Sequence, residues 1–234
     1  MPKAWITRTA PFNRLTARYL RQAGLDPLVE PALRVKPLPL RGPIAAPDAL
    51  VFTSLQGVRL HRFFPSLAEL PVFAVGTHTA RLARMRGYRW VASAAGDVHD
   101  LRQLIRARLD PGAAILHLSA ARPAGDLVAM LSDDGYQARR QVIYQTVEAS
   151  EDDLEDVASN LKNVGAILIH SPRAGSRVAA WLKLRPVGWS GLVCCISDAA
   201  AAPFQDLANV TVAVAARPNE RGMMDLCKET IDRT

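Results

Sequence analysis

A strand–turn–helix stretch around residue 76 carries residue types suited to binding anions. The apolar run Val72–Val75 predicts a buried strand, Gly76 turns the chain, and Thr77 and Thr79 introduce an amphipathic helix over 79–86. Backbone N–H groups and hydroxyls gathered at a helix N-terminus bind carboxylates and phosphates well. Gly76, Thr77 and Thr79 are therefore candidate anion ligands, although a threonine here can equally be an ordinary helix cap.

Hydroxyl and guanidinium groups also follow other predicted strands. These further candidates are Arg8, Ser54, Ser119, Arg122 and Ser171. A serine after a strand commonly caps the next helix, and a surface arginine is often only solvated. Both types could also bind a carboxylate where the strands end, the arginines through two parallel hydrogen bonds.

The elements that would position these side chains alternate along the whole chain. Apolar runs predict strands over 3–8, 28–33, 49–53, 72–75, 89–92, 114–118, 140–144, 166–170, 192–196 and 210–215. Amphipathic segments predict helices over 13–23, 54–64, 79–86, 98–109, 124–131, 150–161, 174–182, 199–207 and 222–231. Strands that alternate with helices favour parallel sheets flanked by helices, the α/β class.

Six acids stand among the nine residues 148–156, which suggests either a metal site or a helix start. Ser150 and Asp153 have the spacing of a capping box, and acids in a first turn favour the helix dipole. Leu154 and Val157 would form the buried face of that helix. Because the acids would point to different sides of the helix and not toward one ion, the helix start is the favoured interpretation.

Two series of elements repeat within the chain. The series of three strand–helix pairs that begins near residue 51 returns near residue 168 in the same order. A unit of strand, polar turn, helix, glycine and strand occurs over 5–24 and again over 116–135. One copy of that unit opens the chain, whereas the other closes its middle block.

The economical explanation of the repeat is two similar flavodoxin- or Rossmann-like α/β domains. Residues 1–36 and 148–234 would form a discontinuous domain around an inserted domain of residues 38–145, with crossings near 36–43 and 144–148. Parallel sheets bind ligands outside the carboxyl ends of their strands, so we expect a ligand cleft between the two domains. Tyr144 would lie at the hinge of that cleft.

The net charge of +7 suggests an anionic partner, and residues 37–147 carry 13 Lys and Arg against 8 Asp and Glu. The arginines lie on amphipathic helices without interleaved aromatics, which disfavours nucleic acid. No apolar run reaches the length of a membrane span, and the first residues read as a strand rather than a signal peptide, so a cytoplasmic protein is expected. The three cysteines lack metal-site spacing, and Cys194 and Cys195 read as small buried hydrophobes.

Several short motifs, taken in order, resemble the uroporphyrinogen-III synthase family over the whole chain. They are Thr7-Arg8, Val51-Phe52-Thr53-Ser54, Ala74-Val75-Gly76-x-x-Thr79-Ala80, Leu118-Ser119-x-x-Arg122-x-x-Gly125-Asp126-Leu127, Gly135-Tyr136, Val142-x-Tyr144-x-Thr146 and Ser171-Pro172. The resemblance implies two α/β domains joined by a two-stranded connector. It implies cyclisation of hydroxymethylbilane to uroporphyrinogen III, with inversion of ring D and loss of water, without a cofactor or metal. We expect the protein to be a monomer.

The resemblance also implies roles for the candidate residues. Tyr144 fits as the acid or hydrogen-bond anchor for the departing hydroxyl, although its ring could simply pack in the core. Thr79 and Ser54, with backbone amides, would hold carboxylates of the small-molecule polycarboxylate substrate. His78 reads as an exposed turn residue rather than an acid–base group.

One departure from the family pattern falls in the second domain. The counterpart of the Gly76–Thr79 turn reads Ser197-Asp198-Ala199-Ala200-Ala201, and Ala200 has no hydroxyl while Asp198 would repel a carboxylate. This leaves open a non-catalytic two-domain module that binds an anionic small molecule such as a tetrapyrrole. A nucleotide-sugar transferase is a third alternative, although the chain is short for one and shows no glycine-rich phosphate-binding motif.

Overall fold

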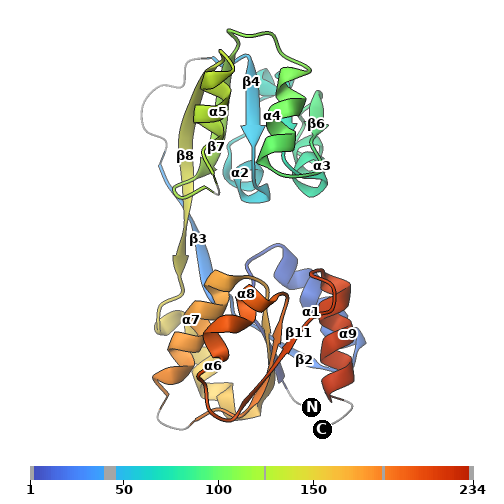
Figure 1. Cartoon of the computed structure of the whole chain (residues 1–234), viewed down its shortest axis with the longest axis vertical. Coiled ribbons are helices and arrows are strands. Elements are labelled where there is room, and N and C mark those ends of the chain that lie inside the picture. The colour runs from blue at the N-terminus through green and yellow to red at the C-terminus, as the bar shows by residue number, and fades with distance from the viewer. Residues whose placement is uncertain (1–2, 40–45, 124, 186–187, 232–234) are drawn as a thin grey trace. The chain divides into compact units, whose positions relative to one another are not determined.

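The computed structural model describes residues 3–39, 46–123, 125–185 and 188–231. The chain divides into two compact units (Figure 1). The discontinuous unit contains the chain up to Arg34 and from Val147 onward, and the inserted unit spans Val35–Thr146. Residues 40–43 of the predicted first crossing lie outside the described residues.

The discontinuous unit is built on a five-stranded sheet with the order β11-β10-β9-β1-β2, in which every adjacent pair is parallel. Its strands are β1 (Lys3–Ile6), β2 (Asp26–Val29), β9 (Val164–Ile169), β10 (Gly191–Cys195) and β11 (Val210–Val214). Its helices are α1 (Phe12–Gln22), α6 (Glu155–Asn160), α7 (Pro172–Lys183), α8 (Asp198–Ala201) and α9 (Glu220–Ile231).

Alternate residues of these strands face opposite layers of helices. Trp5 and Cys195 pack in the core beneath α6, α7 and α8, whereas Ile6 and Cys194 pack in the core beneath α1 and α9. This follows from the period of two in a strand, and it gives strands that are buried on both faces. The prediction that Cys194 and Cys195 are buried hydrophobes is confirmed.

The inserted unit is built on a six-stranded sheet with the order β3-β8-β7-β4-β5-β6. Its strands are β3 (Leu33–Pro37), β4 (Ala49–Phe52), β5 (Val72–Ala74), β6 (Val91–Ser93), β7 (Ala114–Ala120) and β8 (Gln137–Glu148). Its helices are α2 (Leu55–Leu60), α3 (Thr77–Met85), α4 (Val98–Arg106) and α5 (Leu127–Asp133). The strands from β8 to β6 are parallel, with one core beneath α2 and α3 and another beneath α4 and α5.

Strands β3 and β8 form the two-stranded connector. Ala149 N–H donates to Ala32 O at 3.0 Å, and Leu38 N–H donates to Ile143 O at 2.8 Å. Residue numbers rise along one strand while they fall along the other, so this pair is antiparallel. A long β8 can therefore pair with both β7 and β3, and it extends well beyond the predicted strand 140–144.

The internal repeat is confirmed by the topology of the two sheets. The order 2-1-9-10-11 in the discontinuous unit matches 8-7-4-5-6 in the inserted unit, if β1 and β2 correspond to β7 and β8. Gly24 and Gly135 follow the corresponding helices α1 and α5, with φ of 78° and 86°. That left-handed conformation closes a helix C-terminus at little cost only for glycine.

Several predicted elements differ in extent, and prolines explain two of the differences. The predicted strand 28–33 is divided around Pro31 into β2 and β3, which belong to different sheets. The predicted helix 199–207 ends early, because Pro203 lacks the N–H that would continue α8, and a 3₁₀ turn follows. Ser150 and Asp153 form the reciprocal bonds of a capping box at 2.9 and 3.2 Å, although the helix behind them is broken into 3₁₀ and α segments.

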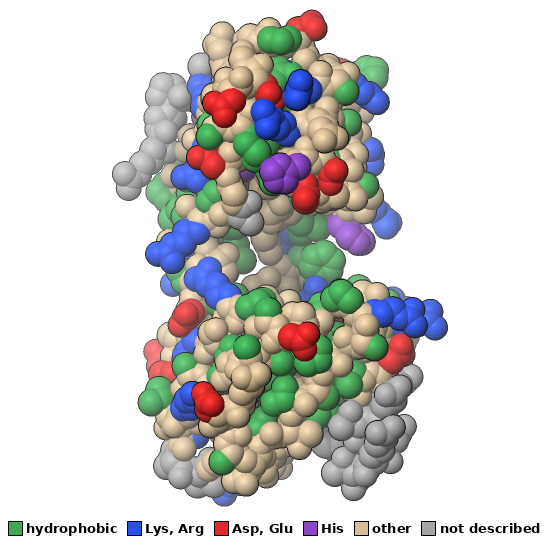
Figure 2. Space-filling view, in the orientation of Figure 1, with side chains coloured by type: hydrophobic (Ala, Val, Ile, Leu, Met, Phe, Trp, Pro, Cys, Tyr) green, Lys and Arg blue, Asp and Glu red, His purple; other side chains and the backbone are tan. Residues whose placement is uncertain are grey.

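Among the described residues, none of the helices combines the length and apolar character needed to cross a membrane. On the face of the molecule that Figure 2 shows, basic and acidic side chains are interspersed rather than gathered by sign.

Candidate functional site

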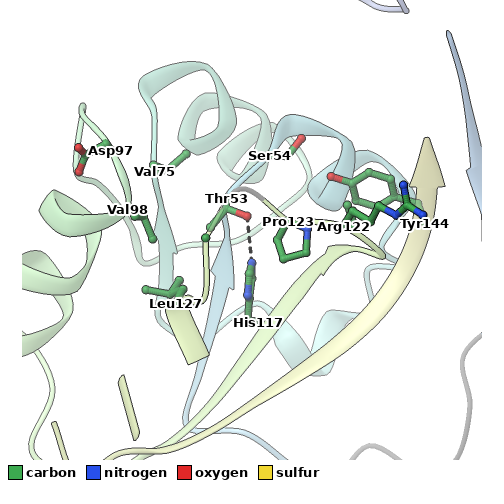
Figure 3. A pocket seen from close by; sticks show the side chains of 12 residues that line it. Thr53, Ser54, Val75, Asp97, Val98, His117, Arg122, Pro123, Leu127 and Tyr144 are labelled. Carbon is green, nitrogen blue, oxygen red and sulfur yellow. Dashed lines mark hydrogen bonds between the residues drawn. The ribbon is translucent and has the colours of Figure 1, made fainter. Parts of the chain in front are cut away.

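A cavity of about 390 Å³ opens at the carboxyl end of the inserted unit's sheet. The residues that line it are Thr53, Ser54, Val75, Asp97, Val98, His117, Ala120, Arg122, Pro123, Gly125, Leu127 and Tyr144 (Figure 3). They come from β7 and β8, from the loops that follow β4, β5, β6 and β7, and from the first residues of α4 and α5. Ligands bind at this edge in parallel α/β sheets, because the connections there are free to vary while the sheet holds them in place.

The phenol of Tyr144 points from β8 toward Ser54 in this cavity (Figure 3). Tyr144 is 5% exposed, and burial raises its pKa, while a hydrogen bond with the Ser54 side chain offsets part of that rise. The Ser54 hydroxyl also accepts the Gln56 N–H at 3.2 Å as the cap of α2. Tyr144 is consequently a neutral proton donor near pH 7.

His117 on β7 faces the same cavity and was not among the predicted site residues. It is 2% exposed, and its Nε2 lies 2.9 Å from the Thr53 hydroxyl. Burial lowers the pKa of His117 to about 4, so the imidazole is uncharged at neutral pH. The only sequence signal was a histidine inside an apolar strand, a pattern more typical of a core residue.

Two charged side chains of opposite sign line the cavity. Arg122, in the loop after β7, is exposed and suits a carboxylate partner. Asp97 caps α4, accepting the N–H groups of His99 and Asp100 at 2.7 and 3.2 Å, and these bonds keep its pKa below the usual range. The remaining lining is largely apolar, which limits the water that can reach a reacting group.

Four predicted residues of the inserted unit do not line this cavity. Gly76 is the N-cap of α3 and Thr77 begins that helix, so the helix starts two residues earlier than predicted. Thr79 is consequently within the first turn and only 5% exposed, and α3 has no side-chain cap. Ser119 lies within β7, 1% exposed, and donates to Ala120 O at 3.1 Å.

The last two predicted residues belong to the discontinuous unit. Ser171 caps α7 by accepting the Ala174 N–H at 3.2 Å, the role that the sequence offered as the alternative to a substrate contact. Arg8 forms an ion pair with Glu220 at the start of α9. Ser197 is the N-cap of α8 without a side-chain bond, and Ala200 is fully buried there.

The cavity brings together a neutral phenol, two hydroxyls, a neutral imidazole, one guanidinium and the helix-capping carboxylate of Asp97. This combination can donate a proton or a hydrogen bond to a leaving oxygen while it holds a carboxylate. Within the described part of the chain, no group of three or more His, Cys, Asp or Glu side chains is arranged to hold a metal ion.

Comparison with known proteins identifies a family model and solved structures that match this chain. The family model described as uroporphyrinogen-III synthase HemD matches residues 15–225. The structure of uroporphyrinogen-III synthetase from Helicobacter pylori is 17% identical, with a TM-score of 0.64, over 98% of this chain and 100% of that chain. A mutant uroporphyrinogen III synthase from Thermus thermophilus is 14% identical, with a TM-score of 0.53, over 100% of both chains.

No curated protein matches the chain in sequence. The two solved structures share its fold despite their low identity, and the family model covers nine-tenths of its length. The chain belongs to the uroporphyrinogen-III synthase family.

Proposed function

We propose that this protein closes hydroxymethylbilane to uroporphyrinogen III, a hydro-lyase reaction in which ring D is inverted and water is lost. Membership of the family supports the reaction. The observation that carries the proposal for this chain is the neutral Tyr144 phenol, which faces a half-enclosed cavity that Arg122 borders. A substrate with many carboxylates also suits a protein of net charge +7.

The reaction begins with departure of the terminal hydroxyl, and Tyr144 would supply the proton or hydrogen bond that lets it leave as water. The raised pKa of Tyr144 keeps the phenol protonated until the C–O bond breaks, and its proton would then pass to the departing oxygen, which leaves as water. The Tyr144 phenolate would regain a proton from ring D when the closed macrocycle becomes aromatic again. Ser54 would orient the phenol through their hydrogen bond. The apolar walls contributed by Val75, Val98 and Leu127 would keep bulk water from the cation that forms.

Ring closure then requires ring D to attack through its substituted carbon, which is a matter of substrate conformation. Arg122 would bind one carboxylate, and the neutral His117 and Thr53 pair would offer a hydrogen bond without adding charge. Holding a flexible chain in one reactive geometry can supply several kcal/mol of the barrier reduction. Gly76, Thr77, Thr79, Ser119, Arg8 and Ser171 remain proposed substrate contacts.

The direct test supplies hydroxymethylbilane, oxidises the products and resolves the uroporphyrin isomers. We expect the type III isomer, formed faster than the spontaneous closure measured in buffer alone. Type I isomer alone, at the spontaneous rate, would overturn the proposed function.

We further propose that the protein acts as a cytoplasmic monomer. All residues that line the cavity come from one unit of one chain. The three cysteines are free thiols, and Sγ of Cys227 lies 3.3 Å from Sγ of Cys194 without a disulfide, which suits a reducing compartment. Sedimentation analysis at several protein concentrations tests the monomer, and a concentration-dependent mass would contradict it.

A further inference from the structure

A second cluster of charged and polar side chains lies at the carboxyl end of the discontinuous unit's sheet. Arg8 follows β1, and His170 follows the neighbouring parallel strand β9. Thr16 belongs to α1 and Glu220 begins α9, two helices that pack side by side on one face of the sheet (Figure 1). The edge position corresponds to that of the cavity in the inserted unit.

The carboxylate of Glu220 is surrounded by three donor groups. Arg8 forms an ion pair with it, and Thr16 donates its hydroxyl to Oε1 at 2.5 Å. Nε2 of His170 lies 3.6 Å from Oε2. A guanidinium, a hydroxyl and an imidazole around one carboxylate are the groups that a protein uses to bind a carboxylate ligand.

His170 is incompletely partnered in this arrangement. Its side chain is 5% exposed, and no hydrogen-bond partner lies within 3.5 Å of either ring nitrogen, because Oε2 of Glu220 stands just beyond that distance at 3.6 Å. Burial lowers its pKa, and the charged groups that face it are Glu220 and Arg8, which act in opposite directions. A buried polar group left without a partner costs free energy, so its retention needs an explanation such as a missing ligand.

We propose that Arg8, Thr16 and His170 form a carboxylate-binding site, that Glu220 occupies it as an internal substitute, and that a carboxylate of the substrate displaces Glu220. The identity of the displacing carboxylate rests on the proposed function, whereas the site itself does not. Arg8 lies 5.0 Å from the centre of the Phe12 ring, a contact that holds the guanidinium while its carboxylate partner changes. The Arg8 and Glu220 side chains are 22% and 19% exposed, so solvent reaches the pair.

The site is tested without catalysis by replacing its internal occupant. We expect Glu220→Ala to gain a saturable rise in Tm with sodium acetate, about 3–6 °C at ten times the dissociation constant, relative to sodium chloride of equal ionic strength. The wild type and Glu220→Ala combined with Arg8→Met should not show it. Glu155→Ala, which removes an exposed acid from the first turn of α6, is the matched control.

An acetate response equal in Glu220→Ala and Glu155→Ala would overturn the carboxylate site. If Glu220→Ala does not fold, Glu220→Gln keeps the size of the side chain and removes its charge. We expect Glu220→Gln to lower KM for hydroxymethylbilane at least about threefold. In the wild type, the Glu220 carboxylate blocks the site in a fraction of the molecules, and the apparent affinity for the substrate is reduced by that fraction. An unchanged or higher KM would overturn the displacement, whereas absence of any cyclisation by the wild type would overturn the proposed function and leave the acetate result to decide the site.

Discussion

The phenol of Tyr144 gives the most direct residue-scale prediction. Tyr144→Phe removes the donor to the departing hydroxyl and keeps the ring in the core, so kcat should fall about 10²-fold or more with little change in KM. The initial rate of type III product measures this. Tyr136→Phe is the control, because Tyr136 is also buried in the inserted unit but donates to Leu109 O away from the cavity. A full rate in Tyr144→Phe would show that this phenol is not required.

The buried His117 and the half-buried His61 of the inserted unit predict how stability depends on pH. Burial lowers the pKa of His117 and of His61 to about 4, from 6.5. The unfolded chain then binds more protons between pH 6.5 and 4, so stability is present above pH 6.5 and is lost as the pH falls through this window.

We expect each of these two histidines to contribute about 1–3 kcal/mol to that loss. Denaturant unfolding at pH 7 and pH 4.5 measures the difference in the free energy of unfolding. His117→Gln should reduce that difference by the contribution of one histidine. His99→Gln is the control, because His99 is exposed in the first turn of α4. The same pH dependence in His117→Gln and in the wild type would contradict the prediction.

At this scale, the sequence predicted some side chains of the cavity and missed others for identifiable reasons. Ser54, Arg122 and Tyr144 follow or end apolar strands, a position that can be read directly. His117 was missed because burial and a partner 64 residues away in sequence determine its place. The burial of Thr79 depends on where α3 begins, and a sequence pattern does not define the first residue of a helix sharply.

At the scale of elements, two close helix contacts depend on a missing side chain. A Cβ at Gly175 in α7 would lie 2.6 Å from Ala200 O, and one at Gly57 in α2 would lie 2.8 Å from Leu118 O. Both contacts are with backbone atoms, which cannot rotate away. The two helices therefore approach their neighbours only because these positions are glycine.

Gly175→Ala should destabilise the protein by about 1–3 kcal/mol, despite the better helix propensity of alanine, because the added methyl forces α7 away from α8. Calorimetry measures the fall in Tm. Gly188→Ala is the matched control, since a Cβ there meets nothing within 4 Å. Equal stability of the two variants would mean that the backbone near Ala200 moves freely.

The class and order of the elements could be predicted because local signals determine them. Apolar runs of strand length, separated by amphipathic helices and ended by glycines such as Gly24 and Gly135, indicate parallel α/β units without any tertiary information. The pairing of β8 with two neighbours in its sheet, β7 and β3, could not be predicted, because β3 lies more than 100 residues earlier in the chain. Long-range pairing of this kind leaves no periodicity in the strand itself.

At the scale of the whole molecule, the two units have sheets of similar topology, but the chain forms the equivalent strands in a different order. The pair β1 and β2 comes first in the discontinuous unit, whereas its counterpart β7 and β8 comes last in the inserted unit. The chain therefore enters and leaves the inserted unit through two adjacent strands, β3 and β8. This arrangement lets each sheet be complete without strands from the other.

The adjacent crossings predict that the inserted unit can be removed. Continuing the pairing of Ala32 with Ala149 places Arg34 opposite Val147, so a two-residue Asn-Gly turn can join them as a β-hairpin. The shortened chain keeps all five strands of its sheet, and we expect cooperative thermal unfolding but no cyclisation, because Tyr144 and its cavity are gone. Calorimetry and circular dichroism test the folding, and Trp5→Ala in the shortened chain should abolish the transition, since Trp5 is fully buried in its core. Gradual, non-cooperative unfolding of the shortened chain would mean that the discontinuous unit needs its insert to fold.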